Sequence, residues 1–239
     1  MQPTFFITGT DTGVGKTVLT TLLAADLRAQ KIRVAAFKPV CSGGRADAEK
    51  IHAALGGALT LDEINRWHFR AALAPVLAAR REKQVVRLAE VLAQLRATRK
   101  NFAVTLVEGA GGLLSPLGED FDSRDLILAL RATPVIVALN RLGAVNHLLL
   151  TLAALPENYR AKAKSCFHVA AATRCRHRHQ RKAARRIFSG EENLHAAVAG
   201  RKFFTGNGGA PPANSPDAAR AGADLTRRKM FCNFGGGRG

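Results

Sequence analysis

The first two thirds of the chain alternate between short apolar runs and stretches with apolar residues every three or four positions. Continuous apolar runs predict strands that are buried on both faces of a sheet. Apolar residues at three- and four-residue spacing predict helices with one buried face. The predicted strands cover residues 5–8, 33–37, 103–107 and 134–139, and the predicted helices cover residues 16–29, 47–55, 82–99 and 146–155.

This order of strands and helices predicts an α/β fold with a doubly wound, mostly parallel sheet and helices on both faces. The pattern stops near residue 164, and residues 165–239 contain only five Ile, Leu or Val residues. So few branched aliphatic side chains can hardly build a core. We therefore predict a folded domain over residues 1–164 and a basic Cys/His/Gly-rich tail over residues 165–239, poorly ordered or only locally helical.

The tail changes aliphatic content, charge and Cys/His content at the same point, which suggests the hypothesis that it is read out of frame. Resequencing the coding region tests this idea, and an intact in-frame gene would count against it. If the hypothesis holds, part of the sheet is missing and the chain is an inactive copy.

The formal net charge of +18 would favour a nucleic-acid partner if it were spread evenly. Residues 1–164 hold 22 basic and 14 acidic residues, a net of +8, whereas residues 165–239 hold 14 basic and 4 acidic residues, a net of +10. The basic character is largely a property of the tail. We therefore do not expect nucleic acid as the partner of the front domain.

No run of 18 apolar residues and no basic segment before an apolar stretch appears, so neither a membrane span nor a signal peptide is expected. Four cysteines in 239 residues do not suggest a disulfide framework. We expect a cytoplasmic protein with no membrane partner.

Residues 9–17 read Gly-Thr-Asp-Thr-Gly-Val-Gly-Lys-Thr, between a predicted strand and a predicted helix, which is the context of a phosphate-binding P-loop. Gly13 and Gly15 would let backbone N–H groups surround phosphate oxygens. Lys16 would reach the β- and γ-phosphates and the Thr17 hydroxyl would bind Mg²⁺. Gly9 stands one residue earlier than in the usual spacing, and a glycine-rich turn that caps a structural helix remains the alternative.

Four segments together resemble the dethiobiotin synthetase family, whose members are ATP-dependent enzymes with a P-loop NTPase fold. Over residues 4–155, the resemblance rests in order on residues 8–17, on Phe37-Lys38-Pro39-Val40-Cys41-Ser42-Gly43, on Val107-Glu108-Gly109-Ala110-Gly111-Gly112 and on Leu142-Gly143-Ala144-Val145-Asn146-His147.

The resemblance implies a role for each matching residue. Lys38 would hold a carbamate made from diaminopelargonate and CO2, and a strand-end lysine in solvent is the alternative. Thr17, Asp47 and Glu108 would bind Mg²⁺, although Glu108 could instead cap a helix or form a salt bridge. The resemblance implies catalytic roles for Lys38, Lys16 and Thr12. It implies that Ser42 and Asn146 contact the substrate. The residues that would contact ATP are Gly13, Val14, Gly15, Lys16, Thr17, Val18, Asp47, Glu108, Gly109, Ala110 and Gly111.

The implied reaction closes the ureido ring of dethiobiotin through a carbamate and a carbamic–phosphoric anhydride. In this family the substrate carboxylate lies at the start of a helix of the partner subunit, so the resemblance implies a homodimer with sites at the interface. Asn146 and His147 could equally be a plain helix N-cap pair.

The chain departs from the family after about residue 164, where the expected adenine-reading Asn motif and Pro-Leu-Gly segment are missing. Zinc ligation in this region has a weak signal, because no pair of cysteines has zinc-finger spacing. A basic RNA-binding arm is a further alternative. The zinc candidates are Cys166, His168, Cys175, His177 and His179.

Three other function classes fit the sequence less well. A ParA/MinD-like partitioning ATPase would carry a second lysine near the start of the loop, but no lysine precedes Lys16. A glutamine-dependent amidotransferase synthetase needs a glutaminase domain, for which 239 residues leave no room. A pure nucleic-acid-binding protein is supported only by charge.

Overall fold

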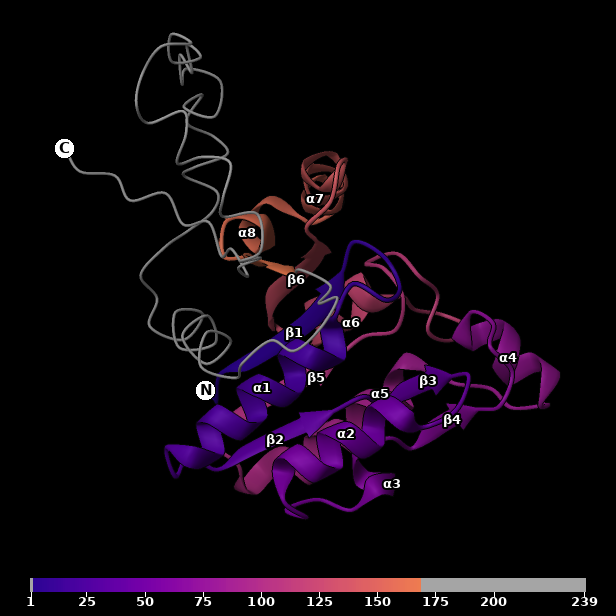
Figure 1. Ribbon diagram of the computed structural model, residues 1–239. Coiled ribbons are helices and arrows are strands. Elements are labelled where there is room, and N and C mark those ends of the chain that lie inside the picture. The colour runs from indigo at the N-terminus through magenta and orange to yellow at the C-terminus, as the bar shows by residue number, and fades with distance from the viewer. Residues whose placement is uncertain (1, 169–239) are drawn as a thin grey trace, which may run out of the picture.

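The computed structural model describes residues 2–168 of the chain (Figure 1). Within them, helices and strands alternate as the apolar pattern predicts. The predicted strands at 5–8, 33–37, 103–107 and 134–139 are all confirmed to within one or two residues. The elements are β1 (Thr4–Gly9), α1 (Lys16–Ala29), β2 (Val34–Phe37), β3 (Val40–Ser42), α2 (Ala46–Leu55), α3 (Leu61–Ile64), β4 (Trp67–Phe69), α4 (Pro75–Arg81), α5 (Leu88–Thr98), the 3-10 turn η1 (Arg99–Asn101), β5 (Val104–Glu108), α6 (Ser123–Leu130), β6 (Thr133–Leu139), α7 (Ala144–Ala153), α8 (Glu157–Arg160) and β7 (Lys164–His168).

The main sheet of the described residues has five parallel strands in the order β2-β5-β1-β6-β7. The chain moves from β1 toward one edge of the sheet to form β2, and from β5 across β1 toward the other edge to form β6. The order thus reverses around β1, and ligands of such sheets bind at the carboxyl ends of the strands near this switch point. The loop after β1 lies there.

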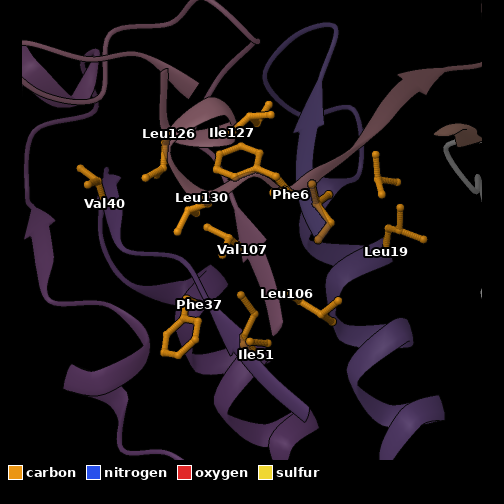
Figure 2. Close-up of a cluster of buried hydrophobic side chains, with 14 of the residues drawn as sticks. Phe6, Leu19, Phe37, Val40, Ile51, Leu106, Val107, Leu126, Ile127 and Leu130 are labelled. Carbon is orange, nitrogen blue, oxygen red and sulfur yellow. The ribbon is translucent and has the colours of Figure 1, made fainter. Parts of the chain in front are cut away.

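Helices α1 and α2 pack against each other and against β2, and α6 contacts α5 and β1 (Figure 1). The central strands are buried on both faces, as their continuous apolar sequences require. Phe6 of β1 points toward Ile127 of α6 in the core (Figure 2). This packing holds the end of β1, and therefore the loop after it, in a fixed position.

The predicted helix over residues 82–99 is wrong in its first part. Helix α4 ends at Arg81, Glu82 is its C-cap, and Lys83 follows with a left-handed φ of 55°. A side chain in this region of φ interrupts a right-handed helix. Helix α5 therefore begins at Leu88. The short elements β3, α3, β4 and α4, as well as α6, were not predicted.

Strand β7 pairs in parallel with β6 from Lys164 to His168, so residues 165–168 belong to the sheet. The boundary predicted at residue 164 therefore falls inside a strand. Ser165, Cys166 and Phe167 include no branched aliphatic residue, which is why the apolar pattern did not reveal this strand. Cys166 is buried in the sheet and His168 ends β7. The other zinc candidates and the remaining predicted features of the tail lie outside the described residues.

Candidate active site

The loop between β1 and α1 has the backbone that a phosphate site needs. Gly13 and Gly15 have left-handed φ values of 73° and 98°, which glycine adopts without steric cost. Gly15 is the N-cap of α1, so the positive end of the helix faces the loop. Lys16 is buried, and its Nζ donates a hydrogen bond to the Asp11 carbonyl at 2.9 Å.

Gly9 is needed for space rather than for an unusual φ. A Cβ at this position would lie 2.6 Å from Cγ2 of Val14 and 2.9 Å from the Asp11 carbonyl oxygen. The early glycine therefore lets the loop fold back onto the end of β1. This explains how the loop closes although its first glycine departs from the usual spacing.

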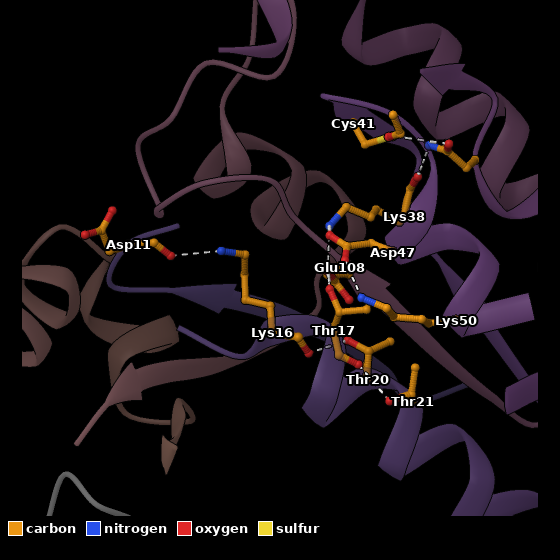
Figure 3. A network of polar contacts seen from close by, with 12 residues as sticks. Asp11, Lys16, Thr17, Thr20, Thr21, Lys38, Cys41, Asp47, Lys50 and Glu108 are labelled. Atoms are coloured by element: carbon orange, nitrogen blue, oxygen red, sulfur yellow. Dashed lines mark hydrogen bonds and ion pairs between the residues drawn. The ribbon is translucent and has the colours of Figure 1, made fainter. Parts of the chain in front are cut away.

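A cluster of charged side chains lies beside the loop (Figure 3). The Lys38 ammonium, just after β2, donates to Glu108 Oε1 at the end of β5 and to Asp47 Oδ2 in the first turn of α2, both at 2.7 Å. The Thr17 hydroxyl donates to the same Glu108 oxygen at 2.6 Å. The alternative of a solvent-exposed Lys38 is therefore wrong, because its exposed fraction is only 5%. Glu108 forms a salt bridge with Lys38, and its role as an Mg²⁺ ligand stays a prediction.

The pKa values within the cluster follow from burial and from these neighbours. Burial, and then the positive charge of Lys38, lower the pKa of Lys16 to about 8, against smaller opposing effects of the nearby carboxylates. Burial by itself would lower the pKa of Lys38, but Glu108 and Asp47 outweigh it and raise that pKa. Burial would raise the pKa of Asp47, yet Lys38 holds it below its usual value. Both Lys38 and Asp47 are therefore charged at neutral pH.

The oxygens in this cluster suit a hard divalent cation. Glu108 is fully buried, and its Oε2 atom has no hydrogen-bond partner among the described residues. A buried carboxylate oxygen without a partner is costly, and a cation ligand would satisfy it. Mg²⁺ binds through one or two carboxylates and keeps several waters, so a site with few protein ligands suffices. The described residues hold no group of three or more Asp, Glu, His or Cys side chains that could bind a metal.

A cavity of about 700 Å³ opens over the loop and the charged cluster. It brings together most of the predicted site residues, including both lysines. Ala110 and Gly111 line it as well, and their contact with a nucleotide stays a prediction. The predicted residues that line the cavity are Thr12, Gly13, Gly15, Lys16, Thr17, Val18, Lys38, Ser42, Asp47, Ala110 and Gly111.

Three residues predicted to contact ATP or the substrate, namely Val14, Gly109 and Ser42, make packing or hydrogen-bond contacts within the protein. The Val14 side chain is buried in the core, which leaves only its backbone for a nucleotide. A Cβ on Gly109 would lie 2.7 Å from Ser123 Oγ and 3.0 Å from the Phe6 ring, so close packing against α6 requires this glycine. The Ser42 hydroxyl donates to the Leu73 carbonyl at 2.5 Å and thereby ties two walls of the cavity together.

The structure does not bring Asn146 to this cavity. Asn146 and His147 are exposed on α7, and the N-cap of that helix is Gly143, which makes no side-chain cap. The alternative of an N-cap pair is therefore wrong. Any role for Asn146 at a substrate site requires a second chain.

Sequence reasoning missed several residues around the cavity. Lys50, one turn after Asp47 in α2, lies 3.7 Å from that carboxylate. The wall formed by Ala72, Leu73, Ala74 and Pro75 comes from a loop with no apolar periodicity, and Ser115 from a loop without a motif. Pro75 could have indicated the start of α4 in the sequence, because proline favours the first position of a helix.

Comparisons with known proteins identify the family. Residues 3–183 match the family described as AAA domain. The ATP-dependent dethiobiotin synthetase of Anaeromyxobacter sp. strain Fw109-5 is 44% identical over 154 residues, which cover 63% of this chain and 69% of that protein. The chain belongs to the dethiobiotin synthetase family. The same enzyme of Bacillus licheniformis is 42% identical over 152 residues, covering 62% of this chain and 65% of that protein.

The chain thus spans about two thirds of the length of these dethiobiotin synthetases. Among solved structures, a ParA family ATPase from Chlorobium tepidum TLS covers 79% of this chain and 82% of its own, with 11% identity and a TM-score of 0.46. None of the helices within residues 2–168 is long and apolar enough to cross a membrane.

Proposed function

We propose that this chain is an ATP-dependent ligase that carboxylates 7,8-diaminononanoate (diaminopelargonate) with CO2 and closes the ureido ring of dethiobiotin in biotin biosynthesis. The observation that supports this most is the presence of two lysines on one cavity, Lys16 at the start of α1 and Lys38 just after β2. Each lysine lowers the cost of placing negative charge there, and the reaction joins two anions, a carbamate and a triphosphate.

The reaction balances in three steps. One amine of the substrate attacks CO2 and loses a proton, which gives a carbamate. A carbamate oxygen then attacks the γ-phosphorus of ATP, and ADP leaves. The second amine finally attacks the carbamate carbon, closes the ring, loses a proton and releases phosphate.

The protein contributes position and charge to these steps. Lys16 and the loop N–H groups would hold the phosphates, and Lys38 would hold the carbamate oxygens beside the γ-phosphate. Thr12 at the cavity mouth would contact the transferring phosphoryl group. Thr17, Asp47 and Glu108 would hold Mg²⁺, which supplies neutralisation of phosphate charge.

A homodimer forms part of this proposal. Helix α7 stands at the β6 side of the molecule (Figure 1) and presents exposed apolar side chains, among them Val145, Leu149 and Leu150. An exposed apolar face of this kind marks an interaction surface. Dimer formation would bury it and bring Asn146 to the substrate of the partner. Sedimentation of the wild-type chain and of Leu150→Glu tests the dimer, and a wild-type monomer at enzyme concentrations would contradict it.

The function itself is tested by incubating the purified chain with ATP, Mg²⁺, bicarbonate and diaminopelargonate and measuring dethiobiotin by mass spectrometry. We expect product that depends on all four components. ATP turnover that requires DNA and yields no dethiobiotin would contradict the proposal and favour a partitioning ATPase.

A further inference from the structure

The backbone of Lys38 is not held by the main sheet. Strand β2 pairs with β5 as far as Phe37, which lies opposite Val107. The next residue, Lys38, donates its N–H to the Ile64 carbonyl at 3.0 Å, and Trp67 donates its N–H to the Pro39 carbonyl at 3.0 Å. After β2 ends, the backbone of residues 38–39 is therefore hydrogen-bonded to the segment from the end of α3 to the start of β4, and not to β5.

Asn65 lies in the middle of this segment and is fully buried. Its Nδ2 atom donates to the Lys38 carbonyl at 2.6 Å and to the Trp67 carbonyl at 3.4 Å. Its Oδ1 atom accepts from Cys41 Sγ at 3.2 Å and from Arg45 Nε at 3.3 Å. A buried carbonyl needs a donor, and an aspartate of the same shape would offer none to Lys38 at neutral pH.

Arg45 connects the same segment to the other partner of Lys38. Its Nη2 atom donates to the Leu61 carbonyl at 3.0 Å and to the Asn65 carbonyl at 2.8 Å. Arg45 is also the N-cap of α2, the helix that carries Asp47 in its first turn. One group of hydrogen bonds thus fixes the backbone of Lys38 and the start of the helix that bears its carboxylate partner.

We infer that Asn65, held by Arg45, is a positioning residue that sets where the Lys38 ammonium lies in the cavity. Asn65 does not line the cavity, so it acts through Lys38 and not on a ligand. The inference rests on the proposed function for its catalytic consequence, but the anchoring of Lys38 can be measured without any substrate. Because the phosphate loop makes none of these contacts, loss of Asn65 should affect Lys38 chemistry and not nucleotide binding.

The test uses Asn65→Asp, which keeps the shape and the acceptor for Arg45 but removes the donor to Lys38. Arg45→Lys is a second variant, in case the first does not fold. Gln94→Ala is the matched control, because the Gln94 amide donates to the Glu63 carbonyl at the end of the same short helix without reaching Lys38. For each chain we would measure kcat for dethiobiotin formation, the dissociation constant for ATP and the thermal midpoint.

A misplacement of about 1 Å can cost about 100-fold in rate, so we expect kcat to fall about 10- to 100-fold in Asn65→Asp and in Arg45→Lys. ATP affinity should stay within about twofold, since the loop and Lys16 keep their bonds. Gln94→Ala should keep the wild-type kcat. Unchanged kcat in both test variants, an equal loss in the control, or a parallel loss of ATP affinity would each overturn the inference.

Hydrogen–deuterium exchange separates this inference from the proposed function. In Asn65→Asp, amides in a peptide over residues 36–42 should exchange faster than in wild type and in Gln94→Ala, while a peptide over residues 9–17 should not change. If the wild-type chain makes no dethiobiotin, the proposed function fails, and this exchange pattern still decides whether Asn65 anchors Lys38. Unchanged exchange over residues 36–42 would overturn the anchoring itself.

Discussion

The two lysines of the cavity are held in different ways. Lys16 follows a glycine-rich loop, and its ammonium donates to the Asp11 carbonyl, only five residues away in the sequence. Lys38 depends on Asn65, 27 residues away, and on Glu108, 70 residues away. A local structure can be recognised in the sequence as a motif, whereas a site assembled from distant segments can be recognised only after folding. We call the phosphate loop with Lys16 the local half of the site, and Lys38 with its distant partners the distant half. The same difference predicts how each half responds to substitution.

The largest effect on stability should come from Lys38→Met. This change leaves Glu108, which is fully buried, without its cation. Removing one partner of a buried pair costs about 3–5 kcal/mol. We expect a loss of this size in the free energy of unfolding, measured with denaturant.

Two further variants provide the controls for Lys38→Met. The double variant with Glu108→Gln should recover much of the loss, because position 108 then no longer holds a buried carboxylate without its Lys38 partner. Lys50→Ala removes a surface partner of Asp47 and should cost less than about 1 kcal/mol. A Lys38→Met variant no less stable than Lys50→Ala would show that the ion pair is not formed in solution.

On the local side, Lys16→Ala should lower kcat about 10²- to 10³-fold with little effect on stability, because this ammonium stabilises charge on the transferring phosphoryl group. Steady-state kinetics together with the thermal midpoint would check this prediction. A kcat within threefold of wild type would remove Lys16 from the site.

Gly9→Ala tests the close approach inside the phosphate loop. The added methyl group would meet Val14 and the Asp11 carbonyl, and overpacking of this kind costs about 1–3 kcal/mol. Gly57→Ala would be a poor control, because that glycine has a left-handed φ of 78°. Ala58→Gly, outside the cavity, is a better control for the effect that an exchange of alanine and glycine has on stability by itself. Wild-type stability in Gly9→Ala would contradict the packing.

The smallest predicted effect is a pH dependence of ATP binding. Lys16 has a pKa of about 8 in the free chain, and a bound triphosphate favours its charged form and raises that pKa. The affinity for ATP is therefore highest below pH 8. As the pH rises above 8, this affinity falls by about tenfold, or about 1.4 kcal/mol, per pH unit. Calorimetry at pH 7, 8 and 9 would measure this, and Lys16→Ala should lose the dependence. Equal affinity at pH 7 and 9 would contradict the prediction.

Sequence reasoning predicted the local half of the site well. The four apolar runs became four of the five strands of the main sheet, because strands buried on both faces have few polar positions to obscure the signal. The loop at residues 9–17 was recognisable because glycine, lysine and threonine act there on adjacent backbone. Lys38, Asp47 and Glu108 were selected by resemblance to a family, and the structure brings all three together.

The distant half was not predictable in the same way. Strands β3 and β4 have three residues each, too short for a period to appear. The role of Asn65 depends on a carbonyl left without a strand partner, which no local pattern shows. The first part of the predicted helix over residues 82–99 failed because Lys83 has a left-handed φ and Arg87 is an extended N-cap, and the apolar spacing shows neither conformation.

The ratio of phosphate released to dethiobiotin formed shows whether ATP cleavage is coupled to ring closure. Phosphate release and dethiobiotin formation should be measured in the same reaction, with and without diaminopelargonate. We expect one phosphate for each dethiobiotin, and almost no phosphate when the diamine is left out. Phosphate released at the same rate without the diamine would contradict it.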